Sequence, residues 1–186
     1  TSFAYSGGGC INRGGRLSTA PGDFFLKWNS LREFPDMFVA EKEGLNLLRS
    51  TRAIDVPEPI AVGEADDHQF LLMEFIEEGR KNKNYWHQLG DQLATLHRHT
   101  QDQFGLHHDN SLGSLLQSNK PSNTWIDFFV KQRLEVPLKQ LEARQAASVS
   151  ARADFDVLYQ RLPIFFLYSW YTRSLPLFMV ICGAVI

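Results

Sequence analysis

The spacing of apolar residues changes once along the chain, and this change limits the folds open to it. Up to about residue 76 the apolar runs are short and extended, except in residues 37–50, where they follow helical spacing. From Tyr85 onward the apolar residues follow helical spacing in every regular segment. Strands with one helix followed by helices alone predict an α+β protein with two lobes, formed by residues 1–76 and 77–163.

The expected elements are bounded by turn residues. Pro21 and Gly22 precede one strand, and the Asp66-Asp67 pair separates two others. Phe104 to about Asn123 is rich in Gly, Asn, Ser and Asp and is expected to be a loop. The strands expected after the first glycine-rich turn are residues 23–28, 60–62 and 69–75, and the helices are 37–50, 85–99, 125–145 and 154–162.

Composition excludes some classes of function. The chain has 186 residues, ordinary globular proportions and a formal net charge of −2, with no basic stripe, so we expect no nucleic-acid partner. Cys10 and Cys182 lie in unlike contexts and form no metal-binding or disulfide framework. These features predict a protein of a reducing compartment, the cytoplasm.

A glycine-rich turn and a strand lysine indicate phosphate chemistry together. Gly7-Gly8-Gly9 allows backbone N–H groups to approach a phosphate, although alone it is also typical of a plain hairpin turn. Lys27 lies in the second strand after this turn, where a kinase needs a lysine to hold nucleotide phosphates. Glu41 in the following helix would orient that lysine, with Glu43 as the alternative. Taken singly, each of these charges is also compatible with a solvated surface.

The segment that ends the first lobe has two compatible interpretations. Residues 71–76, Leu-Leu-Met-Glu-Phe-Ile, follow a buried-strand pattern. In kinases the connector between the lobes follows such a strand, and its backbone pairs with adenine. The segment is therefore expected to be both a core strand and an adenine contact.

The order of short motifs from residue 2 to 162 resembles the fructosamine kinase (ketosamine-3-kinase) family. Any one motif is weak, but the ordered series is specific. The matching residues are Ser6 to Asn12, Arg16-Leu17, Gly22, Phe24 to Lys27, Met37-Phe38, Glu41, Gly44-Leu45, Val56 to Val62, Leu72 to Phe75, Leu89-Gly90, Leu93-Ala94, Leu96-His97, Phe104-Gly105, Asp109-Asn110, Leu112-Gly113, Trp125, Phe128-Phe129 and Arg133-Leu134.

The resemblance implies a protein-kinase-like fold with ATP bound between the lobes. It implies an enzyme that uses ATP and Mg²⁺ to phosphorylate the 3-hydroxyl of ketosamines, the sugar adducts formed on amines, and thereby deglycates proteins or small amines. Aminoglycoside and choline phosphotransferases share the fold and are the nearest alternatives within it.

The same resemblance assigns the site residues. Cys10 is either a small apolar filler in the loop or a redox-sensitive thiol that controls nucleotide binding. The implied roles are phosphate binding by Gly7, Gly8, Gly9, Cys10, Ile11 and Asn12, a phosphate-holding pair of Lys27 and Glu41, adenine contact by Glu74, Phe75 and Ile76, and a sugar site shaped by Asp109 and Asn110.

The last part of the sequence departs from the family. The family's catalytic loop, His-Gly-Asp followed by Asn, and the aspartate that holds Mg²⁺ are both missing, and no acidic residue follows Asp156. Residues 164–186 are almost wholly apolar, but Arg173 and Pro176 interrupt them, so we expect no membrane span. The chain is therefore expected to contain no catalytic residue, no metal-holding residue and an incomplete helical lobe.

A shift of reading frame explains this tail. Residues 179–186, MVICGAVI, can be encoded as ATG GTG ATT TGT GGA GCG GTA AT. Read from a C that ends the preceding codon, the same bases spell His-Gly-Asp-Leu-Trp-Ser-Gly-Asn, the missing loop. We therefore predict a one-base frameshift near Pro163 and an inactive chain with an out-of-frame tail.

A second function remains open at this stage. The chain could be a non-catalytic nucleotide-binding protein whose apolar tail binds a membrane or a partner. In either case the apolar stripe of Trp86, Leu89, Leu93 and Leu96 is expected to face water in part, since the segments that would cover it are missing.

Overall fold

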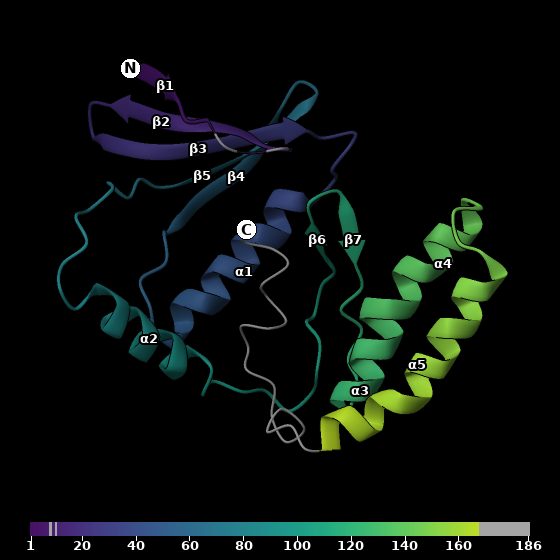
Figure 1. The fold of residues 1–186 in the computed structure, drawn as a ribbon. Coiled ribbons are helices and arrows are strands. Elements are labelled where there is room, and N and C mark those ends of the chain that lie inside the picture. The colour runs from purple at the N-terminus through teal and green to yellow at the C-terminus, as the bar shows by residue number, and fades with distance from the viewer. Residues whose placement is uncertain (8, 10, 168–186) are drawn as a thin grey trace.

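The structure is a computed structural model that describes residues 1–7, 9 and 11–167. An antiparallel sheet with one helix forms one end of the molecule, and the remaining helices form the other (Figure 1). This confirms the expected α+β class, with a sheet lobe followed by a helical part. Residues 168–186, and with them most of the predicted out-of-frame tail, lie outside the described residues.

The sheet contains five antiparallel strands in the order β1-β2-β3-β5-β4. Long β3 lies at its centre and carries Lys27, which is paired with Gly14 of β2 and Leu71 of β5. A Cβ on Gly15 would lie 2.2 Å from the carbonyl oxygen of Ala4, so this glycine lets β1 approach β2 closely. The strands are β1 Ser2–Tyr5, β2 Arg13–Thr19, β3 Gly22–Ser30, β4 Pro59–Ala65 and β5 His68–Glu74.

Helix α1, Met37–Thr51, packs its apolar face against the sheet. Phe38 and Leu45 on this face are 1% exposed and contact Leu71 and Met73 of β5. Asp36 precedes the helix with φ 59° and Arg52 follows it with φ 53°, so both flanking residues take the left-handed conformation. The expected bounds of 37–50 are correct to one residue.

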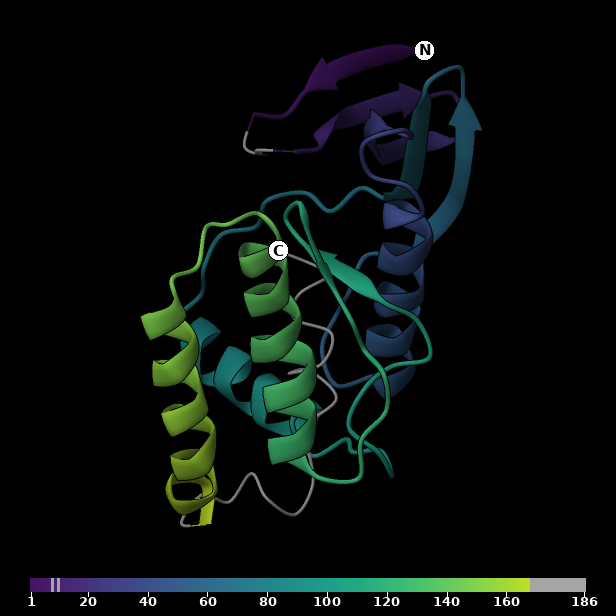
Figure 2. The same cartoon turned by 90° about the vertical axis from the view of Figure 1, so that its right-hand side faces the viewer.

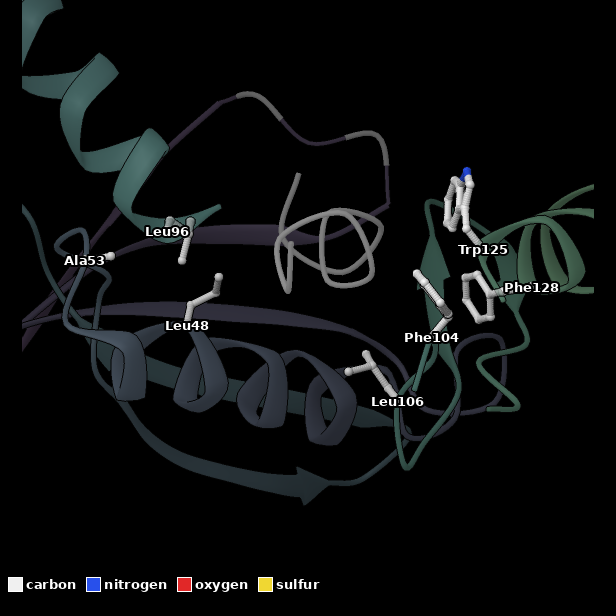
Figure 3. Packing of buried hydrophobic residues seen from close by; sticks show 7 residues of the cluster. All are labelled: Leu48, Ala53, Leu96, Phe104, Leu106, Trp125 and Phe128. Atoms are coloured by element: carbon white, nitrogen blue, oxygen red, sulfur yellow. The ribbon is translucent and has the colours of Figure 1, made fainter. Parts of the chain in front are cut away.

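A second cluster of buried residues joins α1 to the helical part. Leu48 extends from α1 toward Leu96, with Ala53 at the same end of the cluster (Figure 3). The other members are Phe104, Leu106, Trp125 and Phe128. One helix therefore serves two cores, one beneath the sheet and one shared with the helical part.

The helical part contains more structure than expected. The expected loop at 104–123 includes a small hairpin, and the expected helix at 125–145 is regular only at its ends, because its middle is a π-helix. The last helix begins before Asp154 and continues past Pro163. The elements are α2 Tyr85–Leu96, β6 Asn110–Leu112, β7 Leu115–Gln117, α3 Trp125–Phe128, the π-helix η1 Phe129–Glu135, α4 Val136–Ala143 and α5 Val149–Leu167.

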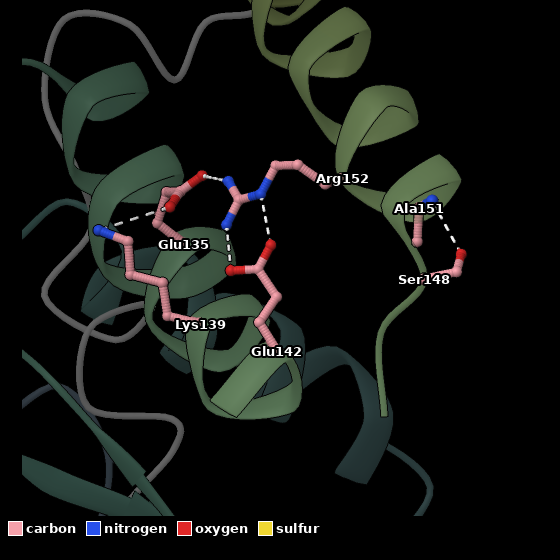
Figure 4. A network of polar contacts seen from close by, with 6 residues as sticks. All are labelled: Glu135, Lys139, Glu142, Ser148, Ala151 and Arg152. Carbon is pink, nitrogen blue, oxygen red and sulfur yellow. Dashed lines mark hydrogen bonds and ion pairs between the residues drawn. The ribbon is translucent and has the colours of Figure 1, made fainter. Parts of the chain in front are cut away.

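Arg152 fastens α5 to α4 and the end of η1 (Figure 4). Its guanidinium donates to both carboxylate oxygens of Glu142, at 2.6 and 2.7 Å, and to Glu135 at 2.5 Å. Burial alone would raise the pKa of Glu135, but Arg152, Tyr159 and the charge of Lys139 together outweigh it and hold this pKa below its ordinary value. The hydrogen bonds from Arg152 also lower the pKa of Glu142. Burial raises the pKa of the neighbouring Tyr159 hydroxyl to about 12.

Among the described residues, no helix combines the length and apolarity needed to cross a membrane. Residues 164–167 continue α5, and the rest of the apolar tail is not described. The alternative function, a nucleotide binder whose tail binds a membrane or a partner, therefore concerns residues outside the described ones.

Candidate nucleotide site

An ion pair between β3 and α1 lies at the centre of the candidate site. The Nζ atom of Lys27 donates to both carboxylate oxygens of Glu41, at 2.6 and 2.8 Å. The Glu41 side chain is 8% exposed and that of Lys27 is 22% exposed. A buried carboxylate needs such a partner, because an unpaired charge there would be costly. The predicted pair is thus present, with Glu41 and not Glu43 as the partner.

The local sequence explains how the two groups meet. Lys27 lies in the middle of a strand that is hydrogen-bonded on both sides, so its backbone is fixed. Its Nζ also lies 5.8 Å from the centroid of the Phe38 ring, on the side of the sheet that α1 covers. Glu41 follows Phe38 by three residues, so the two share a helix face. Packing of Phe38 under the sheet thereby brings Glu41 to Lys27.

The glycine-rich turn connects β1 to β2 and is closed by a bond from the Ser6 N–H to the carbonyl of Gly14, at 3.0 Å. A Cβ on Gly9 would lie 2.7 Å from the carbonyl oxygen of Asn12, so the turn folds back tightly there. Gly7, Ile11 and Asn12 are also described, whereas Gly8 and Cys10 lie outside the described residues. Both interpretations of Cys10, an apolar filler or a redox-sensitive thiol, therefore stay predictions.

Asn29 supports this turn and was not predicted. It lies two residues after Lys27 on the same face of β3, is 4% exposed, and donates from Nδ2 to Oδ1 of Asn12 at 2.8 Å. The same nitrogen lies 3.3 Å from the sulfur of Met37 at the start of α1. Its Oδ1 is buried with no partner among the described residues. An asparagine in a strand pattern was the available signal, because burial of an amide there requires partners.

The expected adenine connector begins at the end of β5. The N–H of Glu74 already donates to the carbonyl of Glu58 at 2.8 Å, and a Glu74 carboxylate oxygen accepts from the Glu58 N–H at 3.1 Å. Phe75 and Ile76 follow the strand, and Ile76 is 57% exposed. The Phe75 ring contacts Arg16 of β2, whose guanidinium carbon is 4.5 Å from its centroid. The N–H of Glu74 is therefore already engaged, and the adenine contact of Phe75 and Ile76 stays a prediction.

The predicted sugar-site residues lie at the start of the β6–β7 hairpin, whose strand β6 contacts α1. Oδ1 of Asp109 accepts from the N–H of Asn119 at 2.7 Å. Asn110 is 2% exposed, and neither its Nδ2 nor its Oδ1 has a partner among the described residues. The structure therefore places Asp109 in a loop-stabilising contact and buries Asn110.

Within residues 1–7, 9 and 11–167, no three His, Cys, Asp or Glu side chains are grouped to hold a metal ion. Lys27 and the glycine-rich turn supply donors of the kind that bind phosphate oxygens.

Comparison with known proteins shows the family of this chain. The sequence model of the Fructosamine kinase family matches residues 1–170. This chain is a member of the fructosamine kinase family.

The relatives show how much of the family's length is present. A probable ketoamine kinase of Synechocystis sp. is 39% identical over 128 residues, which are 68% of this chain and 43% of that protein. The chloroplastic protein-ribulosamine 3-kinase of Arabidopsis thaliana is 34% identical over 168 residues, 89% of this chain and 51% of the relative. The chain therefore spans about half the length of these fructosamine kinase relatives.

A solved structure gives the same fold. The crystal structure of a putative fructosamine-3-kinase from Haemophilus somnus superposes with a TM-score of 0.75 and 24% identity, over 91% of this chain and 56% of the other. At this identity the likeness shows the fold alone, and it confirms the expected kinase-like class.

Proposed function

We propose that residues 1–76 bind ATP, and that the kinase to which this chain corresponds transfers the γ-phosphate to the 3-hydroxyl of a ketosamine, free or protein-bound. The observation that carries the proposal is the buried Lys27–Glu41 pair, 2.6 Å long, beside a glycine-rich turn. Family membership supplies the substrate class. We assign the chain to the cytoplasm because its two cysteines suggest no disulfide framework.

The proposed roles follow from the contacts. Glu41 holds the Lys27 ammonium in one place, so that its remaining donor can meet a phosphate oxygen. Asn29 fixes Asn12 at the end of the glycine-rich turn, whose N–H groups face the same phosphates. The backbone of Phe75 and Ile76 pairs with adenine. Asp109 and Asn110 shape the sugar site from the second lobe, with Asp109 the exposed one of the two.

We further propose that this chain, as its sequence stands, binds nucleotide without transferring phosphate. A kinase needs a carboxylate to accept the proton of the attacking hydroxyl and another to hold Mg²⁺. The sequence contains no acidic residue after Asp156, where the family places both. Bound nucleotide would therefore not react.

The test is ATP binding to the full chain by calorimetry, with Lys27→Ala and Glu41→Gln as variants. A charge-assisted hydrogen bond contributes about 1.5–3 kcal/mol, so each variant is expected to weaken binding about 10- to 100-fold. Lys83→Ala, which removes an exposed connector lysine, is the matched control and should bind as the wild type does. Equal affinities in all four proteins would refute the proposed site, and phosphorylation of a fructosamine by the wild-type chain would refute its inactivity.

A further inference from the structure

The β6–β7 hairpin bridges the two lobes. In Figure 2 it lies between α1 on one side and the α3–α4 helices on the other. Strand β6 lies against α1, and a Cβ on Gly113 at the hairpin tip would be 3.6 Å from Cδ1 of Ile11 in the glycine-rich turn. A segment that reaches both nucleotide-binding elements from the second lobe is placed to influence them.

One polar contact fastens the base of this hairpin to α1. The Nδ1 atom of His108, just before β6, lies 2.6 Å from Oε2 of Glu43. The His108 side chain is 28% exposed and that of Glu43 is 52% exposed, so water screens the contact only in part.

The other end of the connection is built into the helical part. Asn119, which follows β7, is fully buried; its Nδ2 donates to the His108 carbonyl at 3.0 Å and its N–H to Asp109 at 2.7 Å. Arg133 donates to Oδ1 of Asn119 at 2.5 Å and to the carbonyl of Ser118 at 2.6 Å. The Asn119 carboxamide therefore joins the segment that carries His108, through Nδ2, to Arg133, through Oδ1.

Arg133 is directed to this position by the π-helix. It lies within η1, and its guanidinium carbon is 4.6 Å from the centroid of the Phe128 ring. A π-helix turns each residue through a smaller angle than an α-helix does, so it redirects the side chains within it, and such segments are frequent at functional sites. The connection thus runs from η1 through Arg133 and Asn119 to His108 and then to α1.

The N-terminus of α1 has little local stabilisation, so contacts from other elements matter for its position. The side chain of Asp36 makes no capping hydrogen bond at its start, and the first turn contains no acidic residue. Glu41 and Glu43 are two residues apart, so they point about 200° apart around the helix axis. The Lys27 contact and the His108 contact therefore hold α1 from opposite sides.

We propose that His108, held by Asn119 and Arg133, is a positioning residue that sets α1, and through it Glu41, against Lys27. The expected effect on ATP binding rests on the proposed nucleotide site, whereas the positioning of α1 by His108 does not depend on it. Loss of the contact frees one side of α1, so Glu41 holds Lys27 less often in the geometry that meets a phosphate. This is how the second lobe would govern nucleotide binding in the first.

The experiment measures two quantities on the full chain, hydrogen exchange of the α1 amides and affinity for ATP. His108→Ala is expected to speed exchange in residues 37–51 and to weaken ATP binding about two- to fivefold, the range for a partly exposed ion pair. Glu43→Ala should do the same, and the double variant should add nothing further. His108→Lys, which places a cation opposite Glu43, should restore both quantities.

Two controls separate this role from general destabilisation. His87→Ala removes a histidine–aspartate pair of similar length, 2.9 Å, on α2, and His107→Ala removes the exposed neighbour. Neither should change α1 exchange or ATP affinity. If His108→Ala behaves like these controls in exchange, the connection is refuted; if exchange changes but ATP affinity does not, its influence on the nucleotide site is refuted. A wild-type chain without ATP affinity would refute the proposed function alone, because the exchange measurement still decides the connection.

Discussion

The core beneath the sheet and the helices α2 and α5 bury their apolar residues to very different degrees. Beneath the sheet, Phe38, Leu45, Leu71 and Met73 are between 0 and 6% exposed, so this core is closed. In the helical part, large apolar side chains lie open along two helices. The most exposed of them are Trp86 of α2 at 69%, and Val149, Ile164 and Phe165 of α5 at 90, 60 and 68%.

The difference shows where stability resides. The sheet lobe satisfies its backbone within five paired strands and buries its apolar face under one helix. The helical part is attached through the cluster around Leu48 and through polar contacts such as those of Arg152. Exposed apolar area of this kind marks a surface that binds other chains or aggregates. The expected partial exposure of the α2 stripe is confirmed, with Leu89 and Leu93 half-buried and only Leu96 buried.

The largest effect that we expect is in the sheet lobe. Phe38→Ala should lower the free energy of unfolding by about 3–5 kcal/mol, because it leaves a cavity in a closed core. The measurement is urea denaturation, with Phe165→Ala as the matched control on an exposed position, where the change should be below about 0.5 kcal/mol. If Phe38→Ala leaves too little folded protein, Phe38→Leu provides a milder form of the same change. Equal losses for Phe38→Ala and Phe165→Ala would contradict the comparison.

An intermediate effect is expected from acid, which should loosen the helical part first. The pKa values of Glu135 and Glu142 lie below the ordinary value of 4.5 because both accept bonds from Arg152. A lowered folded-state pKa adds stability that is complete above pH 4.5 and is lost as the pH falls through the lowered values. The melting temperature should therefore drop more steeply below pH 4.5 in the wild type than in Arg152→Met. Parallel curves for the two proteins would show that this network contributes nothing to acid sensitivity.

The smallest effect on stability is expected at the exposed stripe. Trp86→Ser should change the free energy of unfolding by less than about 0.5 kcal/mol, because its ring gains little from burial and contacts Lys81 at 4.9 Å in the open. It should, however, lower light scattering from concentrated protein, since it reduces an apolar patch. Trp125→Ser at an 8% exposed position is the contrasting variant and should destabilise strongly. Unchanged scattering in Trp86→Ser would remove this surface as a cause of association.

The elements that the sequence predicts well are those fixed by local pattern. The strand with Lys27 and the helix with Glu41 were placed to within two residues, because burial on one face leaves a period that the sequence displays. The contact between these two side chains was also expected, since chain order in a kinase requires it. Their role with a nucleotide stays a prediction.

The elements that were missed depend on contacts between distant residues. The hairpin β6–β7 has strands of three residues each, too short to show a period, and it is held by Arg133 from the following helices. A π-helix cannot be distinguished from an α-helix by apolar spacing over seven residues. Asn29 and Asn119 are ordinary polar residues in the sequence, and only tertiary burial makes them structural.

Helix α1 belongs to both cores, with Phe38 and Leu45 under the sheet and Leu48 in the cluster shared with the helical part. Two rigid bodies joined by a connector alone could swing freely about it. Here any swing must slide α1 across one of two close-packed surfaces, so the angle between the lobes has few allowed settings. Because α1 packs in both cores, a displacement of the helix at one surface also changes its packing at the other.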